Sequence, residues 1–299
     1  MSYDEFVCKI CDSLNEITGE QIEISVFTAV KNNSCERKGV VFKEKGNNVS
    51  PTIYLEEYYE KFLEEQEIEK IAYEVVKIYD QVKIDHSWEG EFICDFENVK
   101  DKIIFRLINM EKNETLLNQI PFVKYMDFAI VFSVLLELDQ KCGQIAMMQV
   151  RNEHLELWGV CKEELYQHAI INSQNLLPFE FQTMFAVIAD MMGKDECNDL
   201  KKSDDEGDLF VLSNRYRNCG AISICYPGVL ELIGEKLNQN YYILPSSIHE
   251  VIIVPESESI SAVEMKKIVK EVNETYVHKE EYLSDNVYYF DREQKRLIG

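Results

Sequence analysis

The sequence of 299 residues lacks the short motifs that mark the common cofactor-dependent enzymes. It contains no G-x-x-x-x-G-K-[ST] phosphate loop, no G-x-G-x-x-G dinucleotide turn and no G-x-S-x-G nucleophile elbow. Only 12 glycines and 6 prolines are present, which excludes collagen-like and linker-like architectures. We therefore expect no cofactor of these common types.

Long hydrophobic runs are missing as well. The longest apolar stretch, 128–136, is interrupted by Ser133 and is far shorter than the roughly 20 residues of a membrane helix. The first six residues carry neither the basic start nor the apolar core of a secretory signal. Nine scattered cysteines are an odd number and do not resemble a secreted disulfide scaffold. These features predict a cytoplasmic protein with reduced thiols and no membrane contact.

Positively charged residues are scarce: the sequence has 31 lysines and arginines against 54 acidic residues, which gives a net charge of −23. Such a surface repels phosphate backbones, so direct nucleic-acid binding is not expected. The acidity is densest in 54–70, where seven glutamates accompany two lysines. This segment is either a solvated helix face or a surface that attracts a basic protein partner. The candidate partner-binding residues are Glu56, Glu57, Glu60, Glu64 and Glu65.

Enough apolar material is present for a core, with 46% hydrophobic residues. Ser2 with Glu5, and Ser261 with Glu264, have the spacing of capping boxes that begin helices. The apolar stripes of 54–82 do not share one phase, which predicts a kink or two helices near Gln66. Short apolar runs between turn residues predict strands. The predicted class is α+β, with antiparallel-dominated sheets, helices packed on one face and a helix-rich N-terminal part.

The polar segment 193–208 is the predicted boundary within the chain. It separates an N-terminal domain, 1–192, from a C-terminal domain, 209–299, with the order ββαββαβ. Within these domains, the pattern predicts a helix over 179–192. It also predicts a hairpin formed by 209–213 and 221–226.

Several motifs in the second half of the chain occur together in a known pattern. They include Trp158-Gly159-Val160, Tyr226-Pro227-Gly228, the run 243–251 with its Pro245-Ser246-Ser247, and Leu283-Ser284-Asp285. Together they resemble an uncharacterised family of cytoplasmic proteins from clostridial gut anaerobes, a domain of unknown function. The resemblance implies no catalytic role for any residue.

One candidate for chemistry is a cysteine–histidine pair. Cys225 precedes a predicted helix start, where a thiol pKa is lowered, and His249 begins a neighbouring predicted strand. The weak catalytic candidates are Cys225, His249, Ser246, Ser247 and Glu250. The alternative is a packed cysteine, a hydrogen-bonded histidine and serines that satisfy a tight turn. No metal site is predicted, because His249-Glu250 is followed by a strand pattern with Ile253 where a second histidine would stand.

A second candidate is a ligand site at a loop. Arg215 and Arg217 share one predicted hairpin tip, and with Tyr226 they are the candidate ligand-binding residues for a small anion. The leading hypothesis is nevertheless a non-catalytic acidic binding or regulatory protein that engages a basic partner. A Cys225–His249 enzyme and an anion site at Arg215 and Arg217 are the alternatives.

Overall fold

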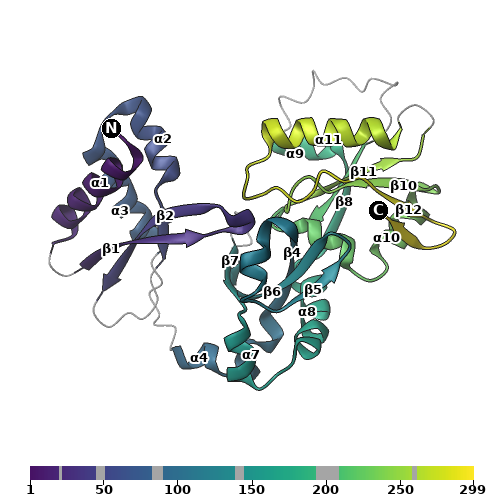
Figure 1. Cartoon of the computed structure of the whole chain (residues 1–299), viewed down its shortest axis with the longest axis horizontal. Coiled ribbons are helices and arrows are strands. Elements are labelled where there is room, and N and C mark those ends of the chain that lie inside the picture. Colours follow the sequence, from purple (N-terminus) through teal and green to yellow (C-terminus); the bar gives the residue numbers. More distant parts are fainter. Residues whose placement is uncertain (20–21, 45–50, 83–89, 139–144, 193–208, 258–260) are drawn as a thin grey trace. The chain divides into compact units, whose positions relative to one another are not determined.

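The structure is a computed structural model that describes residues 1–19, 22–44, 51–82, 90–138, 145–192, 209–257 and 261–299 (Figure 1). The chain divides into two compact units, Met1–Asp95 (unit 1) and Phe96–Gly299 (unit 2). Helices and sheets are mixed along the chain, and every strand pairing in the described ranges is antiparallel. The predicted α+β class is confirmed.

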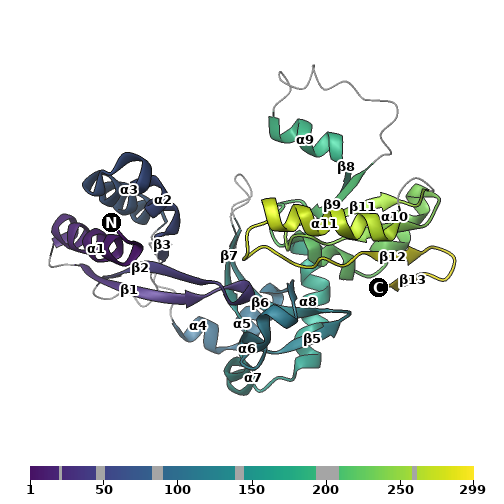
Figure 2. The same cartoon turned by 45° about the horizontal axis from the view of Figure 1, so that its top comes forward.

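Unit 1 is a three-stranded sheet covered by helices. Its elements are α1 (Tyr3–Thr18), β1 (Ile22–Val30), η2 (Asn32–Ser34), β2 (Glu36–Glu44), β3 (Thr52–Tyr54), α2 (Glu56–Glu65), α3 (Ile68–Val82) and α4 (Gly90–Cys94). The strand order is β1-β2-β3, and Figure 2 shows α1 and α3 on one side of β1 and β2. The core forms there, where Phe6 of α1 belongs to the same cluster as Phe42 of β2 and Val75 of α3.

Local sequence signals set the helix boundaries of unit 1. The side chain of Ser2 accepts a hydrogen bond from the Glu5 backbone, and the Glu5 side chain accepts one from the Ser2 backbone, so the predicted capping box is confirmed. Gln66 has a left-handed backbone, with φ 56°, and ends α2 before α3 begins. The predicted break near Gln66 is therefore two helices.

Unit 2 contains two sheets with helices packed against them. Its first half comprises α5 (Phe96–Val99), η3 (Lys100–Lys102), β4 (Ile103–Asn109), η4 (Glu111–Asn113), α6 (Glu114–Leu117), β5 (Phe122–Tyr125), β6 (Phe128–Leu138), β7 (Ile145–Gln149), α7 (Asn152–Trp158) and α8 (Lys162–Leu176). Its second half comprises β8 (Phe179–Thr183), α9 (Met184–Met192), β9 (Phe210–Asn214), η6 (Gly220–Cys225), α10 (Val229–Leu237), β10 (Tyr241–Leu244), β11 (Val251–Pro255), α11 (Ala262–Tyr276), β12 (Tyr288–Asp291) and β13 (Arg296–Ile298).

The four-stranded sheet of unit 2 is organised around β6. This strand pairs with β4 along one edge, and with β5 and then β7 along the other. Its first eight residues are all buried, which explains the continuous apolar run in the sequence. The second sheet has the order β13-β12-β10-β11-β9-β8, and the capping box predicted at Ser261 begins α11 beside it.

Two predicted elements were wrong in part. The helix predicted over 179–192 is confirmed from Met184 onward as α9, and the strand predicted over 209–213 is confirmed as β9. Phe179–Thr183 is not helical but forms β8, where Phe181 stacks on Phe210 of the neighbouring strand β9 with 4.9 Å between ring centroids. The segment 221–226 is not a strand, because most of it lies in the 3₁₀ helix η6. Its alternating isoleucines imitate a strand pattern, but both are buried in the 3₁₀ helix. The order ββαββαβ is therefore not observed.

The division of the chain differs from the predicted boundary near residue 193. Segment 193–208 lies outside the described residues. The strands on its two sides, β8 and β9, pair over five residues, from Phe179 with Asn214 to Thr183 with Phe210. Strand β8 thus belongs to the same sheet as the C-terminal strands, and the two compact units meet in sequence at Asp95 and Phe96.

Candidate functional site

The structure gives Cys225 and His249 different surroundings. Cys225 ends η6, and burial raises the pKa of its thiol, which is the opposite direction to the lowered pKa expected beside a helix N-terminus. A charge on this thiol would raise the pKa of the Tyr125, Tyr166 and Tyr226 hydroxyls. These neighbours are phenols, none of which is a general base for the thiol at neutral pH.

His249 is instead bound to the start of η6. Its Nδ1 accepts a hydrogen bond from the Cys219 backbone N–H at 3.2 Å, and its Nε2 lies 3.6 Å from the Glu281 carboxylate. An Nδ1 that accepts leaves the proton of the neutral ring on Nε2, facing that carboxylate. The imidazole therefore positions the loop before η6.

The two serines predicted beside His249 form hydrogen bonds with backbone groups, and the glutamate is partly exposed. The Ser247 hydroxyl accepts a hydrogen bond from the His249 backbone at 3.1 Å, and the Ser246 carbonyl accepts one from Leu283 at 2.9 Å. Glu250 is half-buried just before β11. The Ser247 contact is that of a tight turn, as the alternative interpretation proposed, whereas the Ser246 carbonyl contacts a distant segment of the chain.

The predicted ligand residues occupy three separate environments. Arg215 is exposed, whereas the Arg217 guanidinium lies 3.3 Å from the Gln182 amide oxygen and 3.4 Å from the Asp190 carboxylate. Tyr226 is 2% exposed, and its hydroxyl donates to the carbonyls of Ser173 and Leu177 at the end of α8. The tyrosine therefore anchors a helix end instead of facing a ligand.

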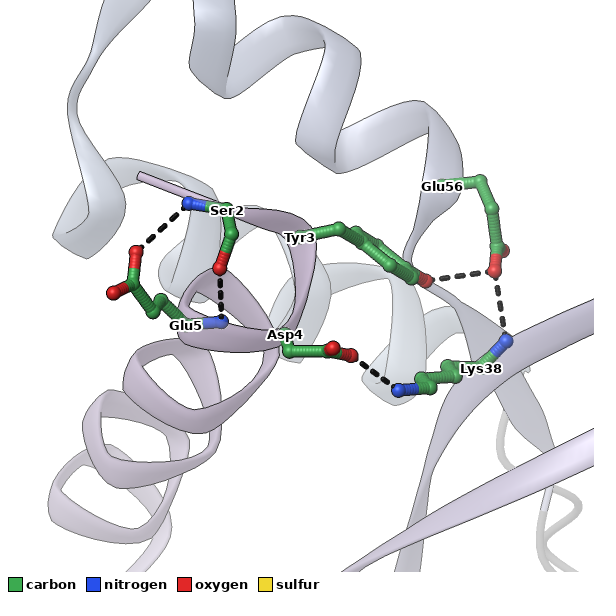
Figure 3. Close-up of polar contacts among 6 residues, drawn as sticks. All are labelled: Ser2, Tyr3, Asp4, Glu5, Lys38 and Glu56. Carbon is green, nitrogen blue, oxygen red and sulfur yellow. Dashed lines mark hydrogen bonds and ion pairs between the residues drawn. The ribbon is translucent and has the colours of Figure 1, made fainter.

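The predicted acidic surface of α2 contains one internal carboxylate. Oε1 of Glu56 accepts hydrogen bonds from the Tyr3 hydroxyl and from the Lys38 backbone, both at 2.7 Å, so Glu56 joins α1, β2 and α2 (Figure 3). Its Oε2 is buried with no hydrogen-bond partner among the described residues. Asp4 forms an ion pair with the Lys38 ammonium beside it (Figure 3). Glu56 is thus a structural residue.

The other predicted acidic residues lie on the outside of α2. Glu65 pairs with Lys70 at 2.7 Å, and Glu57 lies 3.8 Å from Arg37. Glu60 and Glu64 are exposed. The intervening Leu63 is also exposed, at 55%. The outer face of α2 therefore combines carboxylates with one large apolar side chain.

A row of polar side chains that no sequence motif predicted crosses three strands. Arg106 of β4 donates through Nε to the Ser133 hydroxyl of β6 at 2.9 Å, and through an Nη to the Gln149 amide oxygen of β7. A signal was present, because Arg106 is the only charged residue in β4, whose sequence is IIFRLIN. A charged residue in the middle of such a strand is rarely a packing residue.

A second missed cluster surrounds Asp127, in the two-residue turn between β5 and β6. Its carboxylate accepts hydrogen bonds from Ser284 at 3.1 Å, from Asn286 at 2.9 Å and from the Tyr288 hydroxyl. Burial of the phenol, together with its contact with the carboxylate, raises the pKa of Tyr288. Ser284 belongs to the motif Leu283-Ser284-Asp285, so that motif supports the junction between the two sheets.

Within the described ranges, no group of three or more His, Cys, Asp and Glu side chains is placed to hold a metal ion. No described helix combines the length and the apolar character that a membrane crossing requires.

These features define a two-unit α+β protein in which polar side chains tie helices and sheets together. The chain belongs to DUF5688, a family of unknown function, whose family model matches residues 3–292. The predicted resemblance to an uncharacterised family is confirmed to that extent. Neither the curated proteins nor the solved structures contain a match to the chain.

Proposed function

We propose that this protein is a non-catalytic binding protein that engages a basic protein partner through the outer surface of α2. That surface consists of Glu57, Glu60, Leu63 and Glu64. The observation that carries the proposal is the exposure of Leu63, at 55%, among carboxylates spaced three and four residues apart. An apolar side chain surrounded by charges of one sign combines a desolvated contact with electrostatic selection of the partner.

Unit 1 also carries the denser negative charge. Residues 1–95 contain 21 acidic and 10 basic side chains, whereas residues 96–299 contain 33 and 21. The excess per residue is therefore about twice as large in unit 1. A field of this sign raises the association rate of a cationic partner, and the effect weakens as salt increases.

The geometry supports an enzyme based on Cys225 and His249 less well. Burial raises the pKa of the Cys225 thiol, and His249 contacts Cys219 and Glu281. A thiol of raised pKa holds its proton at neutral pH, whereas a nucleophile requires the thiolate.

The test compares two triple variants with the same change in charge. The first, Glu57→Gln with Glu60→Gln and Glu64→Gln, neutralises the α2 surface. The control, Asp12→Asn with Glu16→Gln and Glu23→Gln, neutralises exposed acids on α1 and β1 of the same unit. Proteins captured from lysate of the source organism by the wild type and by each variant are identified, purified and titrated at low and moderate salt.

A partner of the α2 surface binds the α2 variant at least about fivefold more weakly, because three exposed pairs contribute about 1–3 kcal/mol in total. The control variant then loses no more than about threefold, through the long-range field alone. Leu63→Ala weakens binding without changing its salt dependence. Equal losses in the two triple variants contradict the proposal, as does the absence of any captured protein that depends on the α2 surface.

A further inference from the structure

Arg106 lies in the middle of a sheet, held by neutral groups. Its Nε donates to Ser133, and one Nη donates to the amide oxygen of Gln149. The Gln149 amide nitrogen in turn donates to the carbonyls of Phe132 at 2.8 Å and Val150 at 3.1 Å. This second set of bonds fixes the amide so that its oxygen faces the guanidinium.

The strand register places this polar row between two apolar clusters on one face of the sheet. Paired residues of neighbouring strands share a face, and Arg106 pairs with Val131, two residues before Ser133. On one side of the row lies the cluster of Ile108, Ala129 and Val131; on the other lies the cluster of Ile104, Leu135 and Leu177. An aliphatic residue at position 106 would join the two clusters into one core.

The guanidinium has no carboxylate partner in the described part of the chain, whose salt bridges do not include Arg106. An arginine cannot lose its charge in a protein, and a partly buried charge without a counter-charge is costly. An apolar residue of similar volume would remove this cost, against the loss of the hydrogen bonds to Ser133 and Gln149. Packing therefore does not explain why arginine stands at this position.

Cys219, whose backbone is strained, also contacts Arg106. Cys219 is 7% exposed and has a left-handed backbone, with φ 52°, which is unfavourable for a residue other than glycine. Its thiol is within hydrogen-bond reach of Arg106, and its backbone N–H donates to His249. Burial raises the pKa of this thiol and outweighs the opposing effect of Arg106, so the thiol is neutral at neutral pH. The cysteine therefore does not supply the missing negative charge.

The next residue explains how the strained position is held. A Cβ atom on Gly220 would lie 2.5 Å from the Asn214 backbone nitrogen and 2.6 Å from the His249 carbonyl oxygen. Only glycine permits this approach, which places the loop 214–219 above the sheet face that bears Arg106. Tyr216 of the same loop packs on the cluster that contains Ile104.

We propose that Arg106 anchors a binding site for a small oxyanion group, a phosphate, sulfate or carboxylate, between this sheet face and the loop 214–219. A guanidinium has five N–H donors, and the three acceptors described for Arg106 leave two for a ligand. Its planar fork matches two oxygens of such a group. Arg106 and Gln149 are both partly exposed, so solvent reaches the row. The site lies in unit 2 and is independent of the function proposed for α2.

The experiment measures thermal unfolding of the full chain with inorganic phosphate, sulfate or acetate, each against chloride at equal ionic strength. We expect at least one of the three to raise the Tm of the wild type by about 2 °C or more at saturation. The Arg106→Met variant loses this shift, and without ligand its Tm equals or exceeds that of the wild type. Arg296→Met, which removes an exposed arginine from β13, retains the shift.

A second measurement does not depend on the folding of a variant. The chain contains seven arginines, so its side-chain Nε–H spectrum is sparse, and the signal absent from Arg106→Lys identifies Arg106. Titration with the active anion displaces this signal in a saturable way and leaves the Arg296 signal in place. A response to phosphate or sulfate without acetate assigns a tetrahedral anion, and the reverse assigns a carboxylate. The proposal is overturned if no anion displaces the Arg106 signal, or if Arg296→Met removes the thermal shift as well.

Discussion

Glu56 of unit 1 and Arg106 of unit 2 are both partly buried charges whose described hydrogen bonds are to neutral groups, yet their surroundings differ. Glu56 accepts from Tyr3 and from the Lys38 backbone, and these donors come from elements that must meet for unit 1 to fold. Arg106 donates to Ser133 and Gln149, whose strands are already paired through their backbones. The carboxylate therefore joins separate elements, whereas the guanidinium bonds side chains of strands that already pair through their backbones.

The comparison suggests how to separate structural charges from functional ones. A structural charge joins elements that no backbone ladder already holds together, so its loss weakens their contact. A charge kept for a ligand retains spare hydrogen-bonding capacity and tolerates an apolar substitution. The variants below test this distinction, in order of decreasing effect on stability.

The largest effect is expected for Glu56→Ala. The substitution removes two hydrogen bonds to a charged group and leaves the Lys38 N–H and the Tyr3 hydroxyl without their acceptor. Each such bond contributes about 1.5–3 kcal/mol, so the free energy of unfolding falls by about 3 kcal/mol. Urea unfolding measures the change, with Glu60→Ala on the same helix as a control that stays within about 0.5 kcal/mol. A loss for Arg106→Met as large as that for Glu56→Ala would remove the distinction.

A somewhat smaller effect is expected for Gly220→Ala, which tests the loop above Arg106. The added Cβ would lie 2.2 Å from the Ser213 hydroxyl and within 2.6 Å of two backbone atoms, so the loop must shift. Overpacking of this kind costs about 1–3 kcal/mol. The same denaturation assay checks it, and Gly234→Ala serves as the control, because its nearest contact is 3.4 Å, to Arg292 and Phe290 side chains. Equal stabilities of the two variants would show that the loop is not held by this close approach.

An effect of about 1 kcal/mol is expected for Tyr226→Phe. The hydroxyl donates to the carbonyls of Ser173 and Leu177 at a buried helix end. Its removal leaves the Leu177 carbonyl without this donor, whereas the Ser173 carbonyl still accepts from the Leu177 N–H. Calorimetric unfolding gives the loss. The variant also separates the two views of Tyr226: as an anchor it leaves phosphate binding unchanged, whereas as a ligand residue it weakens that binding. Tyr276→Phe, at a 79% exposed side chain, provides the matched control.

Local patterns in the sequence predicted much of the fold. Helix starts follow from side chains that cap the backbone nearby, so Ser2 with Glu5 and Ser261 with Glu264 were recognised directly. The elements that failed depend on distant contacts. β8 is a strand because β9 lies beside it, and η6 is not a strand because Gly220 approaches His249.

The candidate site was less accessible to sequence reasoning for the same reason. Cys225 and His249 suit a catalytic pair by residue type, but their distances and burial belong to the tertiary structure. Glu56 is indistinguishable from Glu57 in the sequence, although one is internal and the other exposed. Only Arg106 is recognisable in the sequence, because it is a cation within the otherwise uncharged strand Ile103–Asn109. The row it forms with Ser133 and Gln149 required the register of three strands.

The effect that is smallest at neutral pH concerns the pH dependence of stability, and it compares Cys225 with the exposed Cys8. Burial raises the pKa of Cys225 above its ordinary value of 9.0 in the folded chain only. Below that value both states hold the proton, and the stabilisation is fully present. As the pH rises past 9.0 the unfolded thiol loses its proton first, so stability falls by up to about 1.4 kcal/mol per pH unit. The loss continues until the folded pKa is reached.

Cys225→Ala removes this contribution, so its stability declines less steeply than that of the wild type above the ordinary thiol pKa of 9.0. Cys8→Ala keeps the wild-type slope, because the side chain at position 8 is exposed. Urea midpoints at successive pH values from 8 upward, about half a unit apart, measure both slopes. Parallel curves for Cys225→Ala and the wild type would mean that solvent reaches the thiol in the folded protein. In that case the thiolate forms readily, and the result would favour the hypothesis of an enzyme that uses Cys225.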